Sequence, residues 1–223
     1  MPYKNSPSFT TNEGIKNFDG PDNDNASARR VAPNPAGGAE VEIGGLPPDG
    51  VVQNGETLRL RGQAYGANYY LTGLRIEEGG RVVIDTASGD VTIWVDSAGA
   101  DYVKGNVEAP NGSTRIRIYY RNASGAGLTI GNRNRANVSL LTSVYAYDYD
   151  PNLNREFGSV SIEGGVALTG SVIAKDVRVE NNASFTLTFP NNRGATQGEG
   201  LLYYGFLPTS WSEYNPIRPV DAL

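Results

Sequence analysis

Arginines occur in pairs two positions apart within one acid-free stretch of the chain. No Asp or Glu lies between Glu108 and Asp148. The stretch supplies six candidate binding residues: Arg115, Arg117, Tyr119, Arg121, Arg133 and Arg135. On a β-strand, side chains two positions apart share a face, and arginine beside an aromatic ring can hold phosphate and stack on bases. The stretch therefore predicts weak binding of DNA or another polyanion; the alternative is that these arginines cover a strand or pair with neighbouring acids.

A second candidate site is the segment DYDPNLNRE, which places oxygen-bearing side chains at alternate positions. These residues are Asp148, Asp150, Asn152, Asn154 and Glu156. Calcium-binding loops use carboxylate and amide oxygens in this way, but the segment lacks the turn glycine and the closing glutamate of an EF-hand. It therefore gives a weaker prediction of a calcium-stabilised loop, and the alternative is a solvated insertion in a protein without cofactors.

Carboxylates that could support catalysis form a third set. The candidates are Glu77, Glu78, Asp85, Asp90, Asp96 and Asp101. Glu77 and Glu78 are adjacent, so on a strand they point to opposite faces and cannot act as an acid and base pair. The chain has no His and no Cys, which excludes imidazole bases, thiolate nucleophiles and Cys/His zinc sites. We therefore expect no enzymatic activity.

The elements that must position these residues are short strands. The chain has 223 residues with 28 Gly, 13 Pro and a net charge of −5. Runs such as ETLRLRG, DVTIWVD and TRIRIYY alternate apolar and polar residues and are bounded by Gly, Asn, Asp or Pro, which is typical of β-strands and corners. No segment has the periodicity of an amphipathic helix. An all-β protein with one main domain is therefore expected.

Self-similar segments indicate which all-β architecture to expect. LRIEEGGRVVI (74–84), VSIEGGVAL (160–168) and VRVENNASFTL (177–187) share a strand, a Glu, a Gly/Asn corner and a second strand. The spacing from Ile76 to Ile93 equals that from Ile162 to Val179. Both spacings suit one coil of a β-helix, which takes about 15 to 20 residues. The pattern predicts a single-stranded β-solenoid, with a β-sandwich or jelly roll as the alternative.

Composition divides the chain into three parts. Residues 1–38 are polar and rich in Asn, Pro and Asp, which predicts an extended arm or linker that cannot fold alone. The solenoid is expected over residues 39–189, and residues 190–223 form an aromatic, Pro-rich cap or tail. No apolar stretch reaches the roughly 18 residues of a membrane-spanning helix. We therefore expect this segment itself to make no membrane contact, and any export signal or anchor to lie outside it.

The order of the strand motifs resembles a known family. The blocks GLRIEEGGRVVIDTASGDVTIWVDSAG, NGSTRIRIYY, GLTIGN, SVYAYD and GSVSIEGGVALTGSVIAKDVRVENNASFTLTF, with SWSEY near the end, are similar to the β-solenoid domain of PilX-like, type IV pilus-associated minor pilins in bacteria. The resemblance covers roughly residues 58–214. The chain departs from the family at Tyr145-Ala146-Tyr147, where the family has a Tyr-Ala-Pro-Asn turn, and then inserts DYDPNLNREFG.

The resemblance implies a function. It predicts a non-catalytic, extracellular structural or adhesive module of a pilus-associated surface protein, with other pilus or filament subunits as partners. DNA uptake is among the roles of the family and agrees with the predicted polyanion site. Two alternatives remain open: a self-assembling extracellular filament or surface-layer subunit, and a glycan-binding or ice-binding surface.

Overall fold

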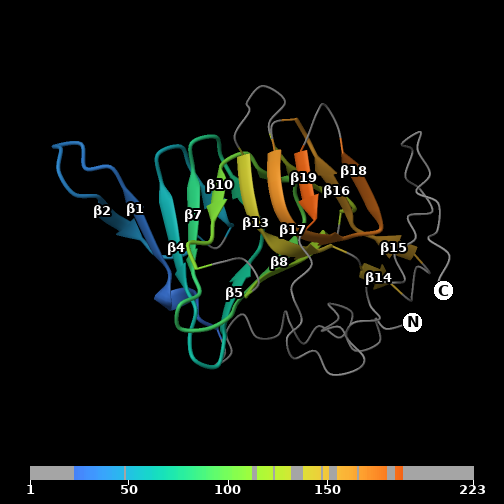
Figure 1. Cartoon of the computed structure of the whole chain (residues 1–223), viewed down its shortest axis with the longest axis horizontal. Helices are drawn as coiled ribbons and strands as arrows, with labels where there is room; N and C mark the ends of the chain where they lie inside the picture. The colour runs from blue at the N-terminus through green and yellow to red at the C-terminus, as the bar shows by residue number, and fades with distance from the viewer. Residues whose placement is uncertain are drawn as a thin grey trace, which may run out of the picture. The chain divides into compact units, whose positions relative to one another are not determined.

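The computed structural model describes residues 23–47, 49–111, 115–122, 124–131, 138–146, 148–150, 155–164, 166–179 and 184–187. Its regular elements are strands, apart from the three-residue 3-10 helix η3 (Asn25–Ser27). Strands of successive turns pair in parallel and stack side by side along one axis (Figure 1). The fold is therefore a β-solenoid, as predicted, and the sandwich alternative is wrong.

Three turns contain three strands each, separated by corners. In chain order these strands are β3 (Val51–Val52), β4 (Thr57–Arg61), β5 (Ala67–Leu71), β6 (Arg75–Ile76), β7 (Arg81–Asp85), β8 (Val91–Ser97), β9 (Asp101–Val103), β10 (Asn106–Glu108) and β11 (Ile116–Asn122). Strands β3, β6 and β9 lie in a six-stranded sheet, and the other six belong to an eleven-stranded sheet. Each turn therefore has three sides.

Later turns have two strands because one long strand replaces two short ones. They contain β12 (Leu128–Ile130), β13 (Val138–Tyr145), β16 (Ser159–Ile162), β17 (Val166–Ile173), β18 (Asp176–Val179) and β19 (Ser184–Leu187). Strand β13 pairs with both β10 and β11. The earlier corners contain Gly, Asn or Pro, whereas the run VSLLTSVY of β13 has none of these residues. Without a turn-forming residue the strand continues straight through the corner position.

A column of β-branched side chains fills the core beneath the six-stranded sheet. Its members are neighbours in the strand register, and all are at most 1% exposed: Val52, Ile76, Val103, Ile130 and Ile162. Burying one side chain of this size contributes about 1.5–3 kcal/mol. The alternating apolar residues of the sequence are therefore the residues that stack from turn to turn.

The predicted repeat spacing matches one turn of the solenoid and fails for another. Ile162 pairs with Val179 in the next turn, as the spacing predicts. Ile76, however, pairs with Val103 instead of Ile93, and Ile93 lies on a different side of the turn beside Ile118. The turn that begins at Ile76 is longer because three strands and three corners need more residues than two. The antiparallel hairpin of β14 (Asp148–Asp150) and β15 (Arg155–Phe157) interrupts another turn.

The last part of the predicted arm forms a strand at one end of the stack. Strand β1 (Arg29–Ala32) pairs antiparallel with β4, and β2 (Val41–Gly44) pairs antiparallel with β1. Both project beyond the first turn in Figure 1. Ala28, just before β1, is fully buried and joins the hydrophobic core. The segment from residue 23 onward is thus part of the folded unit.

Two side chains close the neighbouring edge, at β5. The Asn25 amide group donates to the Tyr70 carbonyl at 2.9 Å and accepts from the Tyr70 N–H at 2.8 Å. The Asp24 carboxylate accepts from the Asn68 N–H at 2.8 Å, and the Asp24 N–H donates to the Asn68 carbonyl at 2.9 Å. These contacts take the place of a further strand, which protects the edge from pairing with another chain.

Corner glycines allow successive turns to approach closely, and a matched pair of substitutions tests this. Gly50 and Gly66 both have positive φ, at 66° and 87°. A Cβ at Gly50 would lie 1.8 Å from the Gly73 carbonyl oxygen, whereas a Cβ at Gly66 would meet nothing within 4 Å. We expect Gly66→Ala to lower the free energy of unfolding by about 1 kcal/mol through backbone strain alone. Gly50→Ala should cost about 2–4 kcal/mol because strain and overpacking add.

Urea unfolding of both variants measures this difference. Equal losses in the free energy of unfolding for the two variants would show that contact between the corners does not exclude a side chain at Gly50.

Candidate functional site

The arginine-rich face is built on β11. Along this strand Ile116, Ile118 and Tyr120 are buried, and the residues between them are half-buried on the outer side: Arg117, Tyr119 and Arg121. Arg115 lies in the turn just before the strand. The remaining two candidates, Arg133 and Arg135, lie outside the described residues. Strand alternation therefore brings three candidates to one face, next to Arg115.

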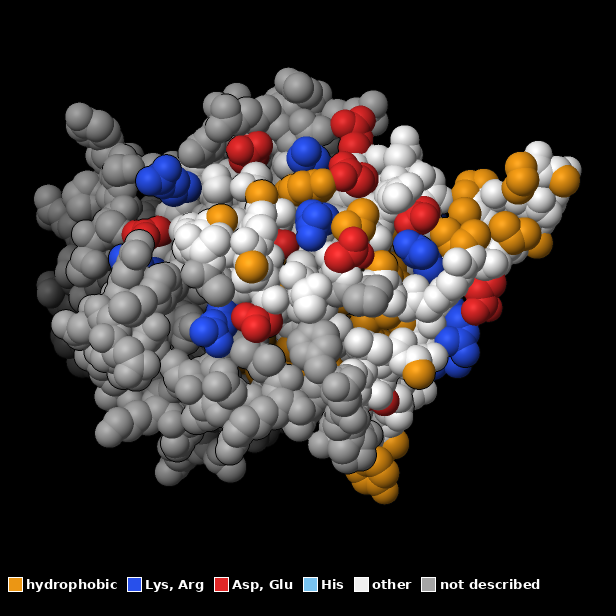
Figure 2. Space-filling model, turned by 180° about the vertical axis from the view of Figure 1, so that it is seen from behind, with side chains coloured by type: hydrophobic (Ala, Val, Ile, Leu, Met, Phe, Trp, Pro, Cys, Tyr) orange, Lys and Arg blue, Asp and Glu red, His pale blue; other side chains and the backbone are white. Residues whose placement is uncertain are grey.

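Acidic side chains of the preceding turn pair with these arginines. Asp90 lies 3.6 Å from Arg115 Nε and 3.3 Å from Arg117 Nη1. Asp96 lies opposite Arg121 in the register of β8 and β11, 3.8 Å from its Nε. Acidic and basic side chains also lie among one another across the face drawn in Figure 2. These acids reduce the local positive charge that the sequence alone suggested.

Aromatic rings stack along the same face. The rings of Tyr119 and Trp94 lie 4.5 Å apart at 17°, and Trp94 continues to Tyr70 at 6.3 Å and 10°. The Trp94 indole N–H donates to the Asn68 side-chain oxygen at 3.0 Å. Burial raises the pKa of Tyr119. One face of the Tyr119 ring is thus occupied by Trp94, which limits its predicted use as a stacking platform for bases.

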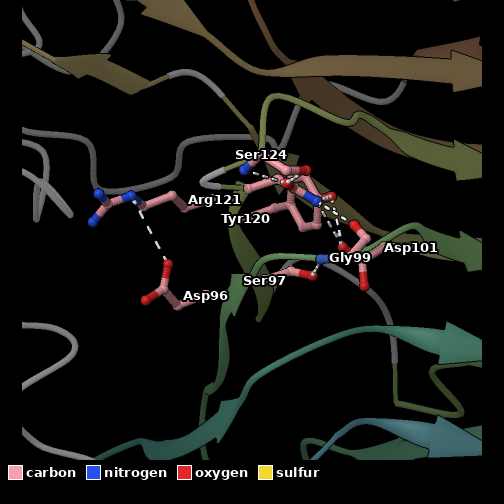
Figure 3. Close-up of polar contacts among 8 residues, drawn as sticks. Asp96, Ser97, Gly99, Asp101, Tyr120, Arg121 and Ser124 are labelled. Atoms are coloured by element: carbon pink, nitrogen blue, oxygen red, sulfur yellow. Dashed lines mark hydrogen bonds and ion pairs between the residues drawn. The ribbon is translucent and has the colours of Figure 1, made fainter.

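A buried polar cluster lies on the core side of β11 (Figure 3). The Asp101 carboxylate is 2% exposed and accepts from the Leu74 N–H at 2.8 Å, the Tyr120 hydroxyl at 2.8 Å and the Asn122 amide at 3.2 Å. The Asn122 amide also donates to the Gly99 carbonyl at 2.6 Å. A carboxylate in an apolar core needs such donors to offset its lost hydration. The cluster therefore joins two successive turns.

The sequence pattern singled out Asp101 but not its partners. Tyr120 and Asn122 share the inward alternation of Ile116 and Ile118. An Asn at a core position of a strand is a signal for a buried hydrogen bond, so the position of Asn122 in the alternation is the sequence signal for this cluster. Burial is the main cause that raises the pKa of Tyr120, and the hydrogen bond to Asp101 acts in the same direction.

The other candidate acids bond to separate partners. Glu77 accepts from the Tyr102 hydroxyl, and Asp85 accepts from the Asn111 amide at 2.6 Å; Glu78 lies in the turn before β7. Within the described ranges, no group of three acids is arranged to hold a metal ion. A small internal pocket of the first turns is lined by aliphatic side chains such as that of Leu60.

The predicted calcium ligands lie on the β14–β15 hairpin. Asp148 and Asp150 belong to β14, and Glu156 belongs to β15. Asn152 and Asn154, between the strands, lie outside the described residues. The backbone thus brings the two ends of the segment together as neighbouring strands, and calcium binding there stays a prediction.

Comparison with known proteins gives no relative for this chain: no protein-family model, no curated protein and no solved structure matches it. Among the described residues, no helix has the length and apolar character needed to cross a bilayer. The fold is therefore established by the structure alone, and the minor-pilin resemblance remains a proposal.

The buried Tyr120 hydroxyl predicts a loss of stability at high pH. Because the fold raises its pKa, Tyr120 stays protonated in the folded state when unfolded Tyr begins to ionise near pH 10. Its contribution is complete below that pH and is lost as the pH rises further. We expect the free energy of unfolding to fall above about pH 10, and Tyr120→Phe to remove up to about 1.4 kcal/mol per pH unit from this slope.

Urea unfolding between about pH 9 and pH 11.5 measures the slope. Tyr65→Phe is the control because this side chain is fully exposed in a corner. An unchanged slope in Tyr120→Phe would contradict the assignment.

Proposed function

We propose that this chain is a non-catalytic structural or adhesive module of a bacterial surface appendage, with other pilus or filament subunits as its partners. The observation that carries the proposal is the parallel β-solenoid itself. Each turn contacts its neighbours through main-chain pairing and a continuous apolar column, which gives a stacked unit that repeats along one axis. The order of strand motifs that resembles minor pilins supports an extracellular, pilus-associated location.

The polar side chains also support a structural role. Asp90 and Asp96 pair with arginines of the next turn, and the Asp101 carboxylate accepts three hydrogen bonds inside the core. Acids that serve as catalysts are positioned to meet a substrate. Here these three candidate acids are used within the fold, so we favour a scaffold over an enzyme.

Localisation tests this proposal. Antibodies raised against the purified chain should label the surface of intact source cells in immunogold microscopy. They should also detect the protein in the appendage fraction released by mechanical shear. Labelling confined to the interior of permeabilised cells would contradict an extracellular role, whatever the biochemical properties of the purified chain.

A second candidate function is weak binding of DNA or another polyanion through the β11 face. The specific observation in its favour is that Arg115 and Arg117 keep 55% and 41% of their side chains exposed although they share Asp90. Two arginines facing one carboxylate leave positive charge that a phosphate can neutralise. With Arg121 added, the described part of this face would engage at most three phosphates.

Fluorescence anisotropy with labelled duplex DNA across a salt series tests this function. Three phosphate contacts predict a log–log salt slope of about −3, and Arg117→Ser should reduce its magnitude by about one. Asp90→Asn should strengthen binding several-fold because it removes the competing carboxylate. Glu108→Gln is the matched control, since it makes the same change in net charge beside Arg81. Equal effects of Asp90→Asn and Glu108→Gln, or no binding at low salt, would exclude this site.

A further inference from the structure

Apolar side chains remain exposed at both ends of the solenoid. Among the described residues only four large hydrophobic side chains are exposed, and three of them lie on end strands: Val41 at 37%, Ile43 at 40% and Val179 at 44%. Val179 continues the column of buried side chains past Ile162. It is exposed because no described turn stacks on it. The two ends therefore expose the kind of residue that the turns between them bury.

On β2 the exposed Val41 lies on the core side of the sheet. Glu42 pairs with Arg29 at 3.4 Å, and Glu40 pairs with Arg59 at 2.8 Å. Arg59 is on the outer side of β4, which alternates with buried leucines. Val41, which pairs with Ala32, therefore lies on the side that is continuous with the core. Ile43 follows at the irregularity in the register between Glu42 and Gly44. In Figure 2 apolar side chains gather on the projecting end that holds these strands.

No described strand pairs with the outer edge of β2. Within the described part of the chain, β2 pairs with β1 on one side and with no strand on the other. By contrast, Asn25 and Asp24 close the edge of β5. An edge strand with apolar residues and no cover is a template for another strand.

The direction of β2 determines which strand fits that edge. Strand β1 runs antiparallel to β4, and β2 runs antiparallel to β1, so β2 points the same way as β4. The parallel pairings from β4 through β7, β10, β13 and β17 give β19, at the far end of the same sheet, this direction too. Moving a second copy along the axis without turning it over brings its β19 beside β2 as a parallel pair, the same pairing that joins the turns.

We propose that copies of this chain associate head to tail, with β2 of one copy continuing the sheet from β19 of the next. The proposal rests on the proposed structural function and names the partner as a second copy. A symmetric pair of β2 strands is less favourable because it would be antiparallel and could place Glu42 opposite its own copy, with like-charge repulsion. A head-to-tail contact made by translation along the axis does not close into a ring, so it produces chains of copies.

The association is tested on the full chain by sedimentation velocity over a range of concentrations. The wild type should form oligomers that grow with concentration. Val41→Lys/Ile43→Lys should weaken association at least about tenfold, because it removes the apolar contact and adds charge at the edge. Tyr65→Lys is the control, since Tyr65 is the fourth exposed hydrophobic residue but lies in the corner between β4 and β5, not on a strand of the proposed contact. A wild type that is monomeric at all concentrations, or an equal loss in the control, would overturn the proposal.

Mixing experiments test the polarity of the contact. Val41→Lys/Ile43→Lys keeps an intact β19 end, so an excess of it should shorten wild-type chains by occupying their β2 edges. Val179→Lys places a charge on β18, the strand that precedes β19 in the last described turn, so it should also reduce chain length by itself but leave β2 intact. A mixture of these two variants should therefore form pairs, through the intact β2 of one and the intact β19 of the other, but no longer chains. If the β2 variant leaves wild-type oligomers unchanged, the head-to-tail arrangement is wrong.

The outcomes separate this inference from the proposed function. If antibodies detect the protein at the cell surface but the purified protein stays monomeric, the head-to-tail contact alone is contradicted. A protein that forms chains in solution but is confined to the cell interior would contradict the surface role and leave the contact standing. Circular dichroism of each variant, compared with the wild type, confirms that it has kept its β-structure.

Discussion

Direct stacking of equivalent side chains in successive turns is the constraint on which the rest of this structure depends. Neighbouring strands in a sheet lie only about 4.8 Å apart, so a side chain in the core meets the residue at the same register position in the next turn. Val52, Ile76, Val103 and Ile130 satisfy this requirement with similar shapes. The lengths of the turns then become secondary, because a corner can gain or lose residues while the register of the strands is kept.

The same constraint explains where polar groups are found. Asp101 replaces an apolar residue at a core position, and the fold supplies it with donors from two other segments of the chain. On the outer side, the register places Asp96 beside Arg121 and the Trp94 ring beside Tyr119. Stacking in a solenoid thus brings together residues about one turn apart in sequence. Many of the charged and polar side chains that were candidates for function are bonded to other residues within the fold.

The ends of a solenoid create a different problem, since the strands there have one neighbour instead of two. At the first turn two features supply the missing neighbour. The Asn25 side-chain amide bonds to the main chain of β5 as a neighbouring strand would, and β1 pairs with β4. The second feature moves the edge outward to β2, which has one neighbour among the described strands. A capped solenoid is suited to a monomer and an open one to assembly, so the state of this edge bears directly on the function we propose.

The sequence by itself determined the fold class, because alternation of apolar residues and Gly/Asn corners is a local property of the chain. Its alternation also predicted one face for Arg115, Arg117 and Tyr119, of which Arg117 and Tyr119 lie on the outer side of β11 and Arg115 in the turn before it. Only the tertiary structure decided that the turn beginning at Ile76 extends to Val103, since the number of sides in a turn depends on which corners bend. It alone decided the ion pairs of Asp90 and the burial of Asp101, because these partners are distant in sequence and meet only when the turns stack.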